Sequence, residues 1–102
     1  MATDEISLRS VVRFDGTNFQ SWKFQMRTLF DYHDLIEIVE GREVIPEATG
    51  GVATRNAERA AWKKKDAKAR FLIITACDEV QMEYFTCNTT NDMWTKLSMI
   101  HE

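Results

Sequence analysis

Apolar residues recur every three to four positions along most of the chain, which is the spacing of amphipathic helices. The first stripe predicts a helix over residues 18–31 and comprises Phe19, Trp22, Met26, Leu29 and His33, broadened by Phe30. A second apolar cluster predicts a short helix over residues 35–39. This helix is expected to end at Gly41, because glycine adopts the left-handed conformation that closes many helices.

The segment before the first helix divides into an arm and a turn. Residues 1–10 are polar and mixed in charge, so we expect a flexible arm there, and residues 11–14 form a short, extended apolar run. Asp15-Gly16 is typical of a turn. Thr17 and Gln20 match a capping box, in which the Thr17 hydroxyl accepts a hydrogen bond from the Gln20 amide.

The second half of the chain predicts a loop, one long helix and two shorter helices. Residues 42–54 contain the sole proline and a Gly-Gly pair, which are typical of a loop. Residues 56–76 contain neither proline nor glycine and predict one long helix. Its apolar stripe comprises Trp62, Ala69, Leu72, Ile73 and Ala76. Residues 79–85 follow a capping aspartate and predict a short helix. Capping residues over 89–92 begin the last helix, with Met93, Trp94, Leu97 and Ile100 on one face.

These segments predict an all-α fold, a compact bundle of about five helices with a short extended N-terminal segment. Strict alternation of apolar and polar residues, which marks a sheet, is nearly absent, and no internal repeat is visible. At 102 residues, of which 44% are hydrophobic, the chain is long enough for one core and too short for two. We therefore expect a single domain over residues 11–102.

The charge balance does not favour a protein held to a polyanion by bulk charge, since the formal net charge is -3. One segment, residues 55–70, is nevertheless basic. Arg55, Arg59 and Lys63 are spaced by one helical turn each and form a stripe that would hold phosphates or the acidic surface of a partner. We favour a solvated face or a partner contact, and binding of nucleic acid through residues 55–70 remains the alternative.

Groups suited to catalysis or metal binding do not converge in this sequence. Cys77 and Cys87 match neither a zinc site nor a disulfide framework and are interpreted as reduced thiols. A cysteine nucleophile would need His33 or His101 close by, and no motif supports that arrangement. Asp15-Gly16-Thr17 has the wrong residue order for an aspartic protease. We therefore predict no enzyme, metal, cofactor or small-molecule substrate.

Signals for secretion or membrane insertion are missing from the sequence. The N-terminus lacks the basic and apolar regions of a secretory signal, and no stretch approaches the roughly 18 apolar residues of a spanning helix. The sequence therefore predicts a cytoplasmic, non-secreted protein with no membrane contact. In that setting the glycosylation sequon at Asn88 stays unused.

Five fragments in a fixed order carry a family resemblance. They are Phe14-Asp15-Gly16-Thr17-Asn18-Phe19 with Trp22-Lys23, Glu37-Ile38-Val39-Glu40-Gly41, the segment from Trp62 to Ala69, Ile73-Ile74, and Asp92-Met93-Trp94-Thr95-Lys96-Leu97. Over residues 11–102 the chain resembles the N-terminal part of Copia-type retrotransposon Gag (capsid) proteins. His101 departs from the pattern, because the family usually carries Tyr there. The matching positions are Phe14, Gly16, Phe19, Trp22, Gly41, Trp62, Trp94 and Leu97.

The resemblance implies a non-enzymatic assembly module. The zinc knuckle with which such Gag proteins handle RNA, the second capsid half and the element's enzymes have no counterpart in this sequence. We therefore expect a homo-oligomer or a module that docks onto other Gag-like chains, either from an element or retained by a host. Surplus apolar groups in the first and last helices and in the run from Val11 to Phe14 support self-association. The candidate contact residues are Phe14, Arg55, Arg59 and Lys63.

Overall fold

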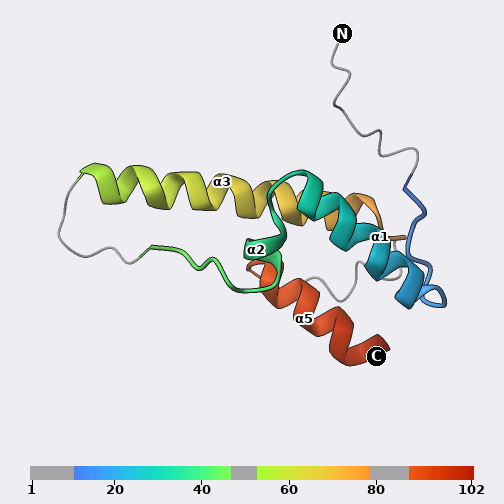
Figure 1. Ribbon diagram of the computed structural model, residues 1–102. Coiled ribbons are helices and arrows are strands. Elements are labelled where there is room, and N and C mark those ends of the chain that lie inside the picture. Colours follow the sequence, from blue (N-terminus) through green and yellow to red (C-terminus); the bar gives the residue numbers. More distant parts are fainter. Residues whose placement is uncertain (1–10, 47–52, 79–87) are drawn as a thin grey trace, which may run out of the picture.

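The computed structural model describes residues 11–46, 53–78 and 88–102, and for residues 53–55 it describes the backbone. These residues form four helices, α1 (Phe19–Tyr32), α2 (Ile36–Val39), α3 (Ala53–Thr75) and α5 (Thr90–His101) (Figure 1). Over the described ranges the chain has no strand, and the predicted all-α class is confirmed at that level. The described residues form four helices, against about five predicted for the whole chain. The arm predicted over 1–10 and the helix predicted over 79–85 lie outside the described residues.

The helices pack around the C-terminal half of α3. The short α2 contacts each of the other three helices, and α1 and α5 lie on the same end of α3 in the ribbon (Figure 1). The core between them is rich in aromatic rings. Trp22 lies 5.1 Å from Phe14 and 6.0 Å from Trp94 between ring centroids, and Phe30 lies 5.6 Å from Trp94. Large flat rings bury much apolar area each, so these contacts dominate the packing of this small core.

The extended segment before α1 is attached to the end of α3. The Phe14 amide donates to the Ala76 carbonyl at 2.8 Å, and the Asp78 amide donates to the Phe14 carbonyl at 3.1 Å. These bonds form an isolated parallel bridge between Phe14 and Cys77. The Trp22 indole donates to the same Ala76 carbonyl at 3.0 Å. The extended conformation predicted for residues 11–14 therefore has a long-range cause, because α3 supplies the hydrogen-bond partners.

The turn before α1 departs from the predicted capping box. The Asp15 carboxylate accepts hydrogen bonds from the Thr17 amide at 2.9 Å and from the Thr17 hydroxyl at 2.7 Å, and both bonds lower the pKa of Asp15. Asn18 is the residue that precedes α1, and it makes no side-chain cap. The capping box between Thr17 and Gln20 was therefore wrong, because the Thr17 hydroxyl is turned toward Asp15.

The other two predicted helix ends are confirmed. The Thr89 side chain accepts from the Asp92 amide at 3.2 Å and caps α5. Gly41 follows α2 with φ +81°, which is the left-handed conformation expected there. A Cβ added at Gly41 would lie 3.0 Å from the side-chain nitrogen Nδ2 of Asn91. That amide donates to the Val39 carbonyl at 2.9 Å, so α5 also caps the end of α2.

We expect Gly41→Ala to lower the free energy of unfolding by about 1–3 kcal/mol, because it strains the backbone and displaces Asn91 from Val39. Gly16→Ala is the control, since Gly16 also has a positive φ, of 97°, in the turn before α1. Urea titration followed by circular dichroism measures both. Equal losses in the two variants would contradict a role for the close approach of Asn91.

The N-terminal half of α3 extends beyond the helices that cover its other half (Figure 1). No residue over 56–65 is buried, whereas Asp66, Ala69, Leu72 and Ile73 are. Residues 43–46 run beside this half: Trp62 donates its indole N–H to the Glu43 carbonyl at 3.0 Å. The helix begins at Ala53, earlier than predicted. The first turns of α3 therefore project away from the core.

Candidate protein-interaction face

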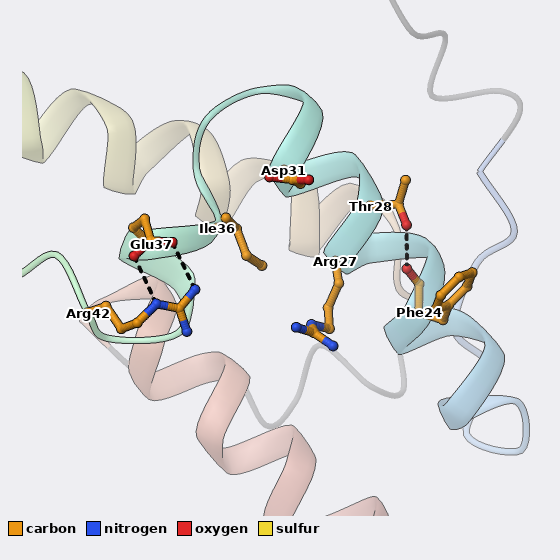
Figure 2. A pocket seen from close by; sticks show the side chains of 7 residues that line it. All are labelled: Phe24, Arg27, Thr28, Asp31, Ile36, Glu37 and Arg42. Atoms are coloured by element: carbon orange, nitrogen blue, oxygen red, sulfur yellow. Dashed lines mark hydrogen bonds and ion pairs between the residues drawn. The ribbon is translucent and has the colours of Figure 1, made fainter.

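One side of the molecule, formed by α1, α2 and α5, carries charged side chains that pair with one another. Three neighbouring hollows of about 360, 480 and 260 Å³ share lining residues and join into one surface. Figure 2 shows the first hollow, where Arg27 of α1 and Ile36 of α2 project toward the same space. We call this surface the α1–α2–α5 face; the members discussed below are Lys23, Phe24, Arg27, Asp31, Glu37, Glu40, Arg42, Met99 and Glu102.

Arg42 organises the charges at the α2 end of this face. Its Nε and Nη2 donate to the two carboxylate oxygens of Glu37 at 2.8 and 2.9 Å, which is a bidentate pair (Figure 2). Its Nη1 donates to Glu40 at 2.7 Å. The guanidinium lowers the pKa of Glu37, and the hydrogen-bonded carboxylates raise the pKa of Arg42. Arg27 of α1 reaches the other oxygen of Glu40 at 3.0 Å, so the network joins α1 to α2.

Lys23 makes the corresponding link between α1 and α5. Its ammonium pairs with the Glu102 carboxylate and donates to the Ser98 hydroxyl at 3.1 Å. The same nitrogen lies 5.8 Å from the ring centroids of both Phe19 and Trp94. Each exposed ion pair contributes only about 0–1 kcal/mol to stability. Their main consequence is therefore a surface on which most charges already have partners and fixed positions.

Two large apolar side chains stand out from this polar surface. Phe24 of α1 is 74% exposed and Met99 of α5 is 79% exposed. Phe24 borders two of the hollows, and Met99 borders the third. Sequence reasoning missed Phe24, although a signal was present: the residue lies off the stripe of Phe19, Trp22 and Met26. An aromatic residue on the polar side of an amphipathic helix indicates a surface role, because the core does not need it.

Phe14, one of the predicted contact residues, lies in the core. It has no exposed surface and packs against Phe19 and Trp22. The prediction that Phe14 contacts a partner was wrong, because the hydrogen bonds of the segment to α3 turn its ring inward. His101 occupies the same cluster, 4.8 Å from Phe14 and 5.4 Å from Phe19 between centroids.

The predicted stripe of Arg55, Arg59 and Lys63 lies on the projecting half of α3. Arg59 is half-buried, and its Nη1 donates to the Pro46 carbonyl at 2.6 Å. Lys63 is exposed, and Arg55 belongs to α3 with its side chain outside the described residues. Arg59 thus holds the chain before α3 in place. This use of its guanidinium weakens the support for the nucleic-acid alternative.

Other basic residues of the same segment also have carboxylate or imidazole neighbours. Arg70 donates to the buried Asp66 at 3.0 Å, and Lys65 lies 3.5 Å from Glu43. The Lys68 ammonium lies 3.5 Å from Nδ1 of His33. Burial, and then the charge of Lys68, lower the pKa of His33. The basic segment is therefore spread over several local contacts instead of forming one continuous cationic strip.

The other positions of the family pattern are structural. Phe19, Trp22, Trp94 and Leu97 are buried in the core, and the rest are Gly16 and Gly41 with positive φ and the half-buried Trp62.

Burial raises the pKa of the Cys77 thiol to about 12, so the thiol stays protonated near neutral pH. Cys87 lies outside the described residues. Among the described residues no cluster of metal-binding side chains occurs, and none of their helices is long and apolar enough to span a bilayer.

These features define a small helical module with an aromatic core and one polar, ion-paired face. The sequence model of the family described as "gag-polypeptide of LTR copia-type" matches residues 26–102 of this chain. The chain therefore belongs to that family. The resemblance predicted from the ordered fragments is thereby confirmed. Membership suggests a structural, capsid-like role in a retrotransposon, and the matched region is a Gag region rather than one of the element's enzymes.

Two curated relatives match nearly the whole chain. The retrovirus-related Pol polyprotein from transposon RE1 of Arabidopsis thaliana is 27% identical over 100 residues, which is 94% of this chain and 7% of that protein. The corresponding polyprotein from transposon RE2 of the same plant is 26% identical over 100 residues, with the same coverage. The chain therefore spans a small part of the length of these relatives. No solved structure matches it.

Proposed function

We propose that this chain is a non-enzymatic assembly module that binds copies of itself, or related Gag chains, through the α1–α2–α5 face. The observation that carries the proposal is the 74% exposure of Phe24, which borders two hollows of a face whose arginines are ion-paired. Protein interfaces commonly place an aromatic anchor inside a polar rim. Family membership supplies the context, because a capsid-like protein acts by contacting other subunits.

The charges of the face favour a protein partner over a polyanion. Arginine and glutamate side chains that already form ion pairs keep their partners when another subunit covers them. No unpaired charge is then buried in the interface. The two signs also nearly balance across the surface. Its members are Lys23, Arg27 and Arg42 against Asp31, Glu37, Glu40 and Glu102.

The oligomeric state of the chain tests this proposal. Gel filtration coupled to light scattering, over a wide concentration range and at two salt levels, is expected to show association that grows with concentration. Phe24→Ser should weaken it by about tenfold or more, because an anchoring aromatic side chain is lost. Val12→Ser is the control, since Val12 is also an exposed apolar residue but lies before α1.

Two outcomes would count against the proposal in different ways. A chain that stays monomeric throughout, and that also fails to bind the Gag region of a relative, would contradict the assembly function. Association that Phe24→Ser and Val12→Ser weaken equally would leave the function standing and remove the α1–α2–α5 face as its site.

A further inference from the structure

A groove on the projecting half of α3 has an apolar floor and lacks a cover from the described core. It lies between α3 and residues 43–46, has a volume of about 530 Å³, and is lined by Glu43, Pro46, Glu58, Ala61, Trp62 and Lys65. Trp62 lies on the same helical stripe as the buried Ala69 and Ile73, two and three turns further on. The apolar stripe of α3 thus continues past the core into a groove with two carboxylates and one ammonium at its edge.

The other half of α3 carries the complementary surface on its outer side. Lys64, Lys68 and Phe71 follow one another at intervals of four and three residues, so they share one helical face. Phe71 is 61% exposed, and Ile74 beside it is also exposed. We call Phe71 with Ile74 the α3 knob. Two lysines precede this knob, and the edge of the groove carries Glu58 and the ion pair of Glu43 with Lys65, so its formal charge is negative.

One copy of the chain is unable to place its own knob in its own groove. Trp62 and Phe71 lie on one continuous helix, about 13 Å apart along the axis and on roughly opposite sides, given 1.5 Å and 100° per residue. A benzene-sized ring needs a cavity of only about 150 Å³, so the groove has room for the Phe71 ring. The chemistry that fits the groove is therefore an aromatic side chain flanked by cations, which a second copy presents.

We propose that the α3 knob of one copy docks in the α3 groove of a second copy, with Lys64 and Lys68 facing Glu43 and Glu58. This contact rests on the proposed assembly function and adds a second interface to the α1–α2–α5 face. It is heterologous, because different surfaces of the two copies meet. Each bound copy still offers a knob at one end and a groove at the other, so the contact builds rings or open chains instead of closed dimers.

The contact is tested by mixing two variants in the Phe24→Ser background, which removes the other face. Phe71→Glu destroys the knob and keeps the groove, whereas Ala61→Arg fills the groove and keeps the knob. Both positions are exposed, so circular dichroism should show unchanged helix content. Each variant alone should associate at least about tenfold more weakly than the background protein. The equimolar mixture should regain one contact and stop at a pair of chains.

Val12→Glu introduces the same charge at a position that is also 61% exposed, and it should leave association unchanged. The head-to-tail contact is overturned if each variant associates as strongly as the background protein. It is also overturned if the mixture associates no more strongly than either variant alone, which is the result expected when the groove binds a different protein. If the unaltered chain never associates and also fails to bind the Gag region of a relative, the proposed function itself fails.

Discussion

Trp22→Ala is expected to remove a large share of the stability of the fold, about 3–5 kcal/mol of its free energy of unfolding. The Trp22 side chain is buried, stacks on Phe14 at 5.1 Å and donates its N–H to the Ala76 carbonyl at 3.0 Å. Truncating a buried Trp typically costs about 3–5 kcal/mol, and a domain of this kind has only about 5–15 kcal/mol of total stability. The loss is large because Trp22 joins α1, the extended segment and the end of α3 at one point.

Urea denaturation followed by circular dichroism measures this effect, with Trp62→Ala as the matched control. Trp62 is half-buried on the projecting half of α3, so its removal should lower the free energy of unfolding by about 1–2 kcal/mol. Trp22→Phe should retain a folded protein, since Ala76 still accepts from the Phe14 amide. Similar losses for Trp22→Ala and Trp62→Ala would show that Trp22 is not the centre of the core.

Asp66→Ala is expected to destabilise the fold by about 2–4 kcal/mol, because it leaves a buried amide without a partner. Asp66 is 3% exposed, and its Oδ1 accepts from the Thr90 amide at 3.0 Å. Its Oδ2 accepts from Arg70 at 3.0 Å. Thr90 is the first residue of α5, so the carboxylate also lies where the helix dipole favours a negative charge. The Thr90 hydroxyl donates back to the Asp66 carbonyl at 2.8 Å.

The control for Asp66 is Asp31→Ala, which removes the same charge from an exposed position on α1. Its free energy of unfolding should change by at most about 0.5 kcal/mol. Asp66→Asn keeps an acceptor for the Thr90 amide and should fall between the two. Equal stabilities for the Asp66 and Asp31 alanine variants, measured by the same urea titrations, would show that Asp66 does not hold α5 on α3.

The helical stripes could be predicted because they depend on local periodicity. Trp22, Met26 and Leu29 are buried as their spacing in α1 predicted, and so are Ile73 and Leu97. The long helix was also predicted in the right place, apart from its first turn. A stripe at helical spacing has one way to be removed from water, namely by facing the other helices, so the burial of most of its members follows from the sequence pattern. Ile100 is an exception, because it was predicted on the stripe of the last helix and is 44% exposed near the end of α5.

The candidate site was predicted poorly, because its residues depend on contacts between distant segments. Phe14 was expected at a partner contact and is in the core. Arg59 was expected to hold phosphates or the acidic surface of a partner, which stays a prediction, and its Nη1 donates to the Pro46 carbonyl. Phe24 and Arg42 were missed, since their importance follows from how α1, α2 and α5 meet. A charge or ring on a helix surface has many possible surroundings, and local sequence does not choose among them.

The sequence by itself determined the family, the all-α class and most of the helical residues that face the core, because local spacing and ordered motifs carry that information. Tertiary structure decided which polar groups are buried and which exposed groups meet on one face. Asp66 is an example: it is an ordinary acidic residue in a basic segment until Thr90, 24 residues away, brings the start of α5 against it. A buried charge requires partners from another element, and only the folded chain brings those partners together.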